Sequence, residues 1–174
     1  MIAVADCVGL WRRILLLEAD GTRDTSTDVL WLQGGTAYVD SRGFAGRLHQ
    51  RDDVFEWHRD IDLLPPSGAP DAGRMRWDGG ILVETGVHSD YVEHWVRETT
   101  EDDPCWALHL RGPAGEYALL MRVGGLFGWA GPSEVTVGTV GDAAWTALDV
   151  VVGEQPTVRG VRWTVSETEG VVKP

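Results

Sequence analysis

Short apolar runs, separated by turns rich in glycine, proline and aspartate, follow one another along the whole chain. Asp20-Gly21 and Asp78-Gly79 are typical two-residue hairpin turns. Runs this short, interrupted this often, indicate strands and not long helices. We therefore expect about ten strands, over residues 9–18, 28–33, 36–42, 54–63, 74–77, 81–86, 91–98, 105–111, 117–123, 144–153 and 159–167.

Helical patterns are confined to two short regions, residues 2–8 and 133–144. A continuous meander of hairpin-linked strands closes most readily as an up-and-down barrel. A chain of 174 residues is long enough to bury a sizeable core as one domain. The pattern thus predicts an all-β fold, a single antiparallel up-and-down barrel of about 8–10 strands, with residues 1–174 as one domain.

The stretch 84–95, ETGVHSDYVEHW, carries unusual chemistry for a strand. Side chains alternate along a strand, so Tyr91, Glu93, Trp95 and Arg97 share one face. A face that mixes aromatic and charged residues is typical of a polar cavity inside a barrel, where each buried charge needs a partner. The partners expected for Glu93 are Arg13, Arg42, Arg59 or Arg97.

The charge balance excludes several classes of partner. The formal net charge is −12 and Lys173 is the only lysine. An acidic domain repels phosphate backbones and anionic membrane surfaces, so we expect neither nucleic-acid nor membrane binding. Schiff-base chemistry has no candidate beyond that lysine in the C-terminal tail.

The N-terminal residues lack the basic and apolar regions of a signal peptide, and no apolar stretch is long enough to span a membrane. We therefore expect a cytoplasmic protein. Cys7 and Cys105 lie far apart with no metal-binding spacing, which predicts two free thiols.

A G-x-W tripeptide, Gly9-Leu10-Trp11, stands at the start of the first predicted strand. Together with TDVLWLQGGTAYVDSR, WHRDIDLLPP and ETGVHSDYVEHW, it resembles a family of small bacterial proteins related to a fungal casein-kinase-interacting protein. The resemblance covers roughly residues 9–97 and implies a lipocalin-like (calycin) barrel. It also implies that Trp11 packs at the closed end against an arginine of the last strand, for which Arg159 and Arg162 are the candidates. It implies no activity.

Candidate site residues are those that could line the barrel interior. A bidentate arginine could clamp a carboxylate, while a desolvated glutamate or a histidine could move a proton. The ligand-binding candidates are Gln33, Asp40, Arg42, Trp57, Arg59, Tyr91, Glu93 and Trp95. If the protein is an enzyme, the catalytic candidates are Glu93, Tyr91 and His58. A structural salt-bridge network at one end of the barrel would use the same residues.

Metal and haem sites are weaker hypotheses. Residues 58–60 and 88–90 both read H-x-D, which could place two ligands on one face of a strand. His94 or His109 could ligate a haem. The metalloprotease motif H-E-x-x-H and paired C-x-x-C motifs are absent, so we expect no metal and no cofactor.

Three functions fit these observations. The first is a binding barrel for a small, partly apolar ligand, for which a carboxylate is one feature that arginines could recognise. The second is a cofactor-independent enzyme of the isomerase, cyclase or lyase type that acts on such a ligand. The third is a structural or protein-interaction module with a filled barrel. The sequence also allows a homodimer.

Overall fold

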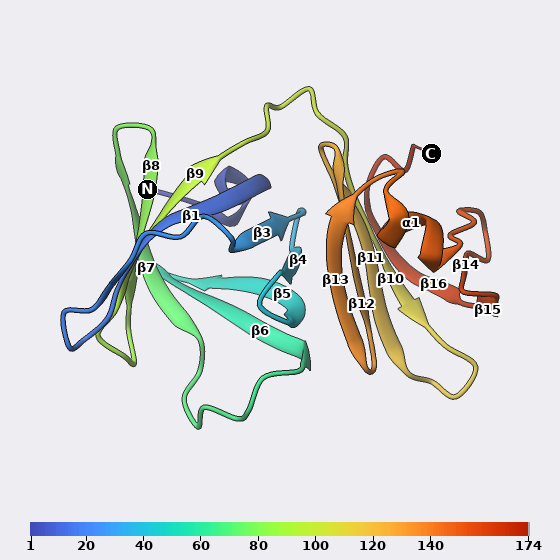
Figure 1. Ribbon diagram of the computed structural model, residues 1–174, viewed down its shortest axis with the longest axis horizontal. Coiled ribbons are helices and arrows are strands. Elements are labelled where there is room, and N and C mark those ends of the chain that lie inside the picture. The colour runs from blue at the N-terminus through green and yellow to red at the C-terminus, as the bar shows by residue number, and fades with distance from the viewer. Residues whose placement is uncertain (174) are drawn as a thin grey trace.

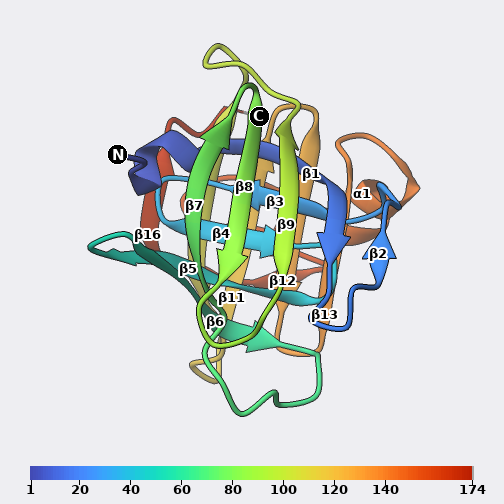
Figure 2. The ribbon, with the colours of Figure 1, turned by 90° about the vertical axis from the view of Figure 1, so that its left-hand side faces the viewer.

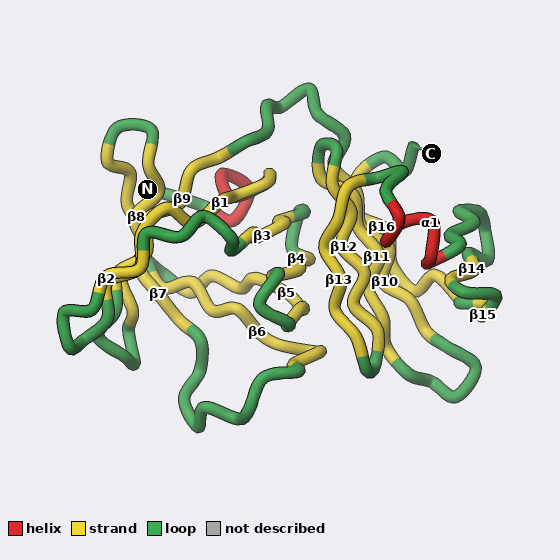
Figure 3. Tube along the Cα trace, viewed as in Figure 1, coloured by secondary structure: helices red, strands yellow, loops and turns green. Residues whose placement is uncertain are grey.

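The computed structural model describes residues 1–173, and nearly all of its regular elements are strands (Figures 1 and 3). The first half of the chain contains the 3-10 helix η1 (Val4–Cys7) and strands β1 (Gly9–Leu17), β2 (Arg23–Asp24), β3 (Leu30–Gln33), β4 (Ala37–Asp40), β5 (Phe44–Arg51), β6 (Val54–Asp62), β7 (Ala72–Asp78), β8 (Ile81–Gly86) and β9 (Val92–Arg97). The second half contains β10 (Cys105–Arg111), β11 (Tyr117–Val123), β12 (Leu126–Gly131), β13 (Glu134–Thr139), α1 (Ala143–Leu148), β14 (Thr157–Val158), β15 (Val161–Arg162) and β16 (Thr164–Gly170).

Strands β1 and β3 to β9 form a closed antiparallel barrel of eight strands. Each strand pairs with the next along the chain, and β9 returns to pair with β1, where Trp11 is opposite Arg97 and Leu16 is opposite Glu93. The short β2 only extends β1. The predicted fold class, an up-and-down antiparallel barrel, is confirmed, and the architecture is consistent with a lipocalin-like fold.

The barrel is complete at Arg97, and the later strands lie outside its wall. Five of them form a second antiparallel sheet in the order β13-β12-β11-β10-β16, which stands beside the barrel in Figure 1 and behind β7, β8 and β9 in Figure 2. The short β14 and β15 pair only with each other. A shared core joins the two layers, with Leu32 and Val39 of the barrel among Leu119 and Met121 of the second sheet. The layers approach so closely that a Cβ added to Gly128 would lie 2.9 Å from Val39 Cβ.

This second packing layer explains why β3 and β4 are apolar on both faces. Trp31 and Tyr38 belong to the core inside the barrel, whereas Leu32 and Val39 belong to the core between the two sheets. A strand buried on both faces reads as a continuous apolar run, because both sets of alternating side chains leave water.

One end of the barrel is closed by η1 and Trp11. The indole Nε1 of Trp11 donates to the Cys7 carbonyl oxygen at 2.6 Å, and its ring stacks on Trp31 with centroids 5.6 Å apart. The Arg97 guanidinium lies over the Trp11 ring at 4.7 Å and donates to the Asp6 carbonyl oxygen. The arginine of the last barrel strand is therefore Arg97.

The expectation that Arg159 or Arg162 covers Trp11 is wrong. Arg159 forms an ion pair with Glu134 of the second sheet, and Arg162 belongs to the exposed strand β15. Both lie beyond β9, which completes the barrel, so neither is on the last strand of the barrel wall.

The helical predictions are partly correct. Residues 4–7 form the 3-10 helix η1 within the predicted region 2–8. Residues 134–139 form strand β13, and the only α-helix described in residues 1–173, α1, covers 143–148, part of which we expected to be a strand. The side chain of Asp142 accepts a hydrogen bond from the backbone N–H of Trp145 and so caps α1.

Both cysteines are free, as predicted. Burial raises the pKa of Cys7 to about 12, so this thiol stays protonated at neutral pH. Among residues 1–173, no helix combines the length and apolar character that a membrane span requires.

Candidate functional site

A cavity of about 180 Å³ opens at the end of the barrel opposite η1. The last residues of β1 and the first residues of β9 meet there, since Leu16 is paired with Glu93. The side chains lining the cavity are Leu16, Glu18, Trp31, Asp40, Arg42, Phe44, Trp57, Arg59, Asp71, Glu84, Tyr91, Glu93 and Trp95. They combine a floor of aromatic rings with a rim of charged groups.

Two glutamates stand side by side in the wall. Glu84 of β8 and Glu93 of β9 are directly opposite each other in the antiparallel ladder, and both are buried. Opposed residues on one face of a sheet have Cβ atoms about 5 Å apart. Two carboxyl groups so close in a dry site cannot both be ionised cheaply, so their surroundings decide which of them carries the charge.

Glu93 is the member of the pair that has cationic partners. Arg13 Nη1 lies 2.8 Å from Glu93 Oε1, and Arg42 Nη1 lies 3.2 Å from the same oxygen. Arg42 in turn binds Asp40 through Nε and Nη2, at 2.9 and 2.8 Å. The Arg13 and Glu93 side chains are each 6% exposed, so this ion pair is almost completely removed from water.

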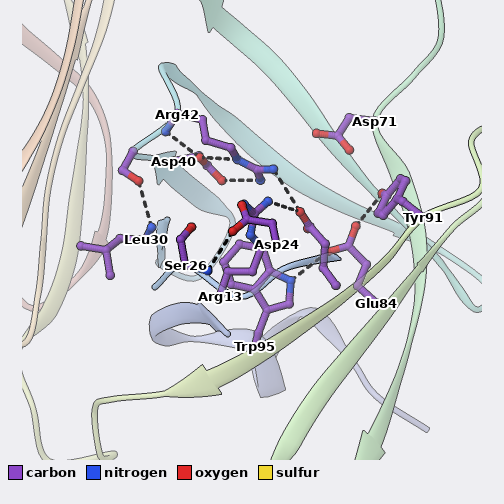
Figure 4. A network of polar contacts seen from close by, with 12 residues as sticks. Arg13, Asp24, Ser26, Leu30, Asp40, Arg42, Asp71, Glu84, Tyr91 and Trp95 are labelled. Carbon is purple, nitrogen blue, oxygen red and sulfur yellow. Dashed lines mark hydrogen bonds and ion pairs between the residues drawn. The ribbon is translucent and has the colours of Figure 1, made fainter. Parts of the chain in front are cut away.

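Glu84 has only neutral hydrogen-bond partners. The Tyr91 hydroxyl donates to Glu84 Oε1 at 2.7 Å, and the Trp95 indole Nε1 donates to Oε2 at 3.3 Å (Figure 4). Burial, then the charge of Glu93, raise the pKa of Glu84 well above its ordinary value. Gly73 on the neighbouring strand provides the space, because a Cβ there would lie 2.7 Å from Glu84 Cγ.

The aromatic floor is fixed by ring contacts and hydrogen bonds. Trp31 lies 5.6 Å from both Trp57 and Trp95, edge to face with each. The Trp31 indole Nε1 donates to Gln33 Oε1 at 3.0 Å, and the Gln33 amide donates to the Gly34 carbonyl oxygen at 3.1 Å. Gln33 therefore orients Trp31 from below and is not itself part of the cavity lining.

A second ion-pair group borders the mouth. Arg59 of β6 binds Asp71 at 2.8 Å and Asp62 at 3.2 Å. Its guanidinium lies over the Phe44 ring at 3.6 Å from the centroid. Asp71 belongs to the loop that leads into β7, which places the long predicted loop at the edge of the cavity.

Most of the predicted site residues are brought together here. Those that line the cavity are Asp40, Arg42, Trp57, Arg59, Tyr91, Glu93 and Trp95. The inward assignment of Tyr91, Glu93 and Trp95 agrees with the structure, and two of the partners expected for Glu93, Arg13 and Arg42, contact it.

Gln33 and His58 are the exceptions, and the placement of His58 inside the barrel is wrong. The His58 side chain is 57% exposed, lies 3.6 Å from Asp60 and packs on His49. Trp57 and Arg59 line the cavity, and alternation then turns the intervening side chain outward. His58 therefore has no access to a ligand in the barrel.

The sequence reasoning missed Glu84, Asp71, Trp31 and Phe44. Glu84 is the first residue of the stretch 84–95, and the pairing of this stretch with itself as a hairpin could have identified it. In an antiparallel hairpin, residues opposite each other share a face, so a glutamate placed opposite Glu93 also points inward. Finding it required the pairing register, which the turn at 87–90 obscured.

Metal and haem hypotheses find little support in the described geometry. No group of three or more His, Cys, Asp or Glu side chains in residues 1–173 is arranged to hold a metal ion. Both ring nitrogens of His109 are engaged, Nδ1 with the Tyr117 hydroxyl at 2.9 Å and Nε2 with Glu169 at 3.0 Å. His94 lies on the face of β9 opposite to Glu93 and Trp95.

Comparisons with protein-family models, curated proteins and solved structures found no match to the chain. The class of protein is therefore defined by the fold and the site: an eight-stranded antiparallel barrel with a small, polar and aromatic cavity at one end.

We expect Glu84→Gln to make the protein more stable than the parent at neutral and alkaline pH, with no gain near pH 4.5. The folded-state pKa of Glu84 is raised above its ordinary value of 4.5, so its stabilising contribution is complete below that pH and is lost as pH rises through the folded pKa. Between pH 4.5 and the folded pKa, the difference in free energy of unfolding between Glu84→Gln and the parent should therefore grow by up to about 1.4 kcal/mol per pH unit.

Urea unfolding at a series of pH values measures this gap. Glu98→Gln is the matched control, because Glu98 is a partly exposed glutamate just beyond the same strand pair. A difference in free energy of unfolding between Glu84→Gln and the parent that stays constant with pH would show that folding does not raise the pKa of Glu84.

Proposed function

We propose that this protein is a binding barrel for a small, partly apolar ligand that enters the cavity between β1, β6, β8 and β9. The observation that supports binding is the composition of the cavity lining, in which five aromatic side chains and several fixed charged groups surround one open cavity. Ligand sites are concave and mostly apolar, with a few placed polar groups that fix orientation. A barrel filled only for stability has no need of an opening with this composition.

The cavity volume limits the ligand. At about 180 Å³ the cavity is smaller than the roughly 300 Å³ at which pockets for drug-sized ligands begin. It exceeds a cavity of about 150 Å³ that accepts benzene in another protein. The proposal is therefore a ligand built on a single ring or a chain of similar size.

An enzymatic role is the second candidate, and the Glu84–Glu93 pair is the observation that favours it. A carboxylic acid with a raised pKa beside a carboxylate held by arginines is the arrangement of a general acid next to a general base. Such a pair would suit a cofactor-independent isomerase or lyase. Tyr91, which is bonded to Glu84, would orient the acid.

The finer family assignment also remains a proposal. The closed end, with Trp11 of the G-x-W beneath Arg97, supports a place among the calycin barrels and the bacterial family that the sequence resembles. A cytoplasmic location and a homodimer remain predictions from sequence.

Cavity-filling variants test the binding proposal. We expect the parent to bind single-ring fragments, such as benzyl alcohol, with a rise in melting temperature and a change in tryptophan fluorescence. Leu16→Trp should abolish both responses, because Leu16 lines the cavity opposite Glu93. Leu15→Trp should keep both, because Leu15 pairs with His94 on the outer face.

Calorimetric titration with a panel of neutral, cationic and anionic single-ring fragments completes the test. Binding to the parent and to Leu15→Trp, but not to Leu16→Trp, supports the proposal. If no fragment of any charge binds the folded parent, or if Leu16→Trp binds as well as the parent, the barrel is a structural module and the proposal fails.

A further inference from the structure

We propose that the ligand of the barrel cavity is a small organic cation, an amine on a body of about one ring, held between the Glu84 carboxylate and the indole rings of the floor. This inference rests on the proposed binding function and names the class of ligand. Four observations lead to it: the charge of the lining, the engagement of the arginines, the isolation of Glu84 and the contacts of the aromatic rings.

The lining carries more acid than base. Two guanidinium groups, those of Arg42 and Arg59, face five carboxyl groups, which belong to Glu18, Asp40, Asp71, Glu84 and Glu93. Even with Glu84 neutral, the acidic groups outnumber the basic groups. Such a cavity attracts a cation and opposes the entry of an anion.

Both arginines of the lining are already engaged by carboxylates. Arg42 is bound by Asp40 through two hydrogen bonds and also contacts Glu93. Arg59 is bound by Asp62 and Asp71. A ligand carboxylate would have to displace these partners, so the arginine clamp suggested by the sequence is an unfavourable mode of recognition in this geometry.

Glu84 is the buried carboxyl group of the lining that still lacks a counter-ion. It is 3% exposed, and no Arg, Lys or His nitrogen in residues 1–173 makes an ion pair with it. Its two hydrogen-bond donors are the neutral Tyr91 hydroxyl and Trp95 indole. An ammonium group in the cavity would provide the charge partner that Glu93 already has in Arg13.

Two aromatic side chains of the lining already contact a cation of the protein itself. The guanidinium of Arg42 lies 5.9 Å from the Trp95 ring centroid and 5.2 Å from that of Phe44. Trp31 and Trp57 complete the floor. A cation over an indole face is stabilised by the ring quadrupole, and more strongly when water is excluded.

Binding of an amine then carries a proton signature. The groups that act on Glu84 are Glu93 and Asp71, which favour its neutral form, and Tyr91 and Arg42, which favour its ionised form; Cys7 of η1 is also within electrostatic reach. An ammonium ion brings positive charge to Glu84, so the Glu84 carboxyl group releases its proton to the buffer on binding. At pH values below the folded pKa of Glu84, each further decrease of one pH unit should therefore lower the affinity for the amine by up to about tenfold.

Isothermal titration calorimetry with benzylamine, benzyl alcohol and sodium benzoate compares three charges on one ring. We expect benzylamine to bind at least about tenfold more tightly than benzyl alcohol, and benzoate to bind more weakly than either. Benzylamine titrations in two buffers of different ionisation enthalpy should show release of a proton. Glu84→Gln should lose the preference for benzylamine over benzyl alcohol and the proton release. Glu98→Gln should match the parent.

The outcomes separate the two proposals. If benzyl alcohol binds as tightly as benzylamine, or benzoate binds most tightly, the cation inference is overturned and the binding function stands. The inference is likewise overturned if Glu84→Gln keeps the full preference for benzylamine. If none of the three compounds binds the folded parent, the proposed function itself fails.

Discussion

Glu93→Gln should lower the free energy of unfolding by about 3–5 kcal/mol, the cost of breaking a buried ion pair by removing one partner. Glu93 is 4% exposed and Arg13 is 5% exposed, so the substitution leaves a guanidinium that water cannot reach. Arg13 would keep Asp24 at 3.1 Å, a carboxylate on the exterior that is 42% exposed and so a weaker partner. Arg42 would keep Asp40 and lose less.

The control for this prediction lies next to Arg13 on β1. Arg12 and Glu98 form an ion pair across β1 and the end of β9, but their side chains are 33% and 35% exposed. Glu98→Gln should therefore cost only about 0–1 kcal/mol. Arg13→Met in the Glu93→Gln background should recover part of the loss, because it removes the unpaired guanidinium.

Equilibrium unfolding in urea at one pH measures these differences. The proteins to compare are the parent, Glu93→Gln, Glu98→Gln and the double variant Glu93→Gln/Arg13→Met. If Glu93→Gln costs no more than Glu98→Gln, water or another group reaches Arg13, and the account of a dry, paired glutamate is wrong. If Arg13→Met adds to the loss and does not relieve it, the side chain of Arg13 stabilises the barrel mainly by packing.

The second large effect is expected at Glu169, where Glu169→Ala should cost about 2–4 kcal/mol because it leaves the backbone N–H of the buried Ala37 and the ring of the buried His109 without their partner. From β16 of the second sheet, Glu169 accepts hydrogen bonds from the backbone N–H groups of Thr36 and Ala37 in the barrel and from the Thr36 hydroxyl at 2.8 Å. It also contacts His109, which is 1% exposed, at 3.0 Å. One carboxylate thus joins the two layers.

The pH dependence of this effect has a defined sign. Burial opposes ionisation of Glu169, but the hydrogen bonds from His109, Thr36 and Ala37 outweigh it and lower its pKa to about 2. The stabilising contribution is therefore complete above the ordinary value of 4.5 and is lost as pH falls through about 2. Glu169→Ala should lack this acid-dependent loss.

Glu167→Ala is the matched control for Glu169→Ala. Glu167 belongs to the same strand and pairs with Arg47 of the barrel, but its side chain is 48% exposed. Its removal should cost about 0–1 kcal/mol. Urea unfolding from neutral pH into the acid range measures both variants. Equal losses for the two would show that Glu169 acts as a surface residue and does not hold the layers together.

Much of the local architecture follows from the sequence. Alternation with a period of two places Tyr91, Glu93 and Trp95 on one face, and the structure keeps that face inward. The same rule should have excluded His58, since it lies between Trp57 and Arg59, both of which line the cavity. Adjacent residues of a strand point to opposite faces, so the three could not have lined the cavity together.

What the sequence by itself determined is therefore most of the barrel strands and the inward face of β9, because these depend on neighbours along the chain. It missed β5 and β12, placed β13 in a helical region and expected a strand where α1 lies. Only the tertiary structure decided which strand closes the barrel, and thus that Arg97, and not Arg159, covers Trp11. It also decided that Glu84 stands opposite Glu93 and that Arg13 reaches Glu93 from β1. These contacts depend on pairing register and barrel closure, which bring together residues far apart in the chain, and no local pattern encodes either.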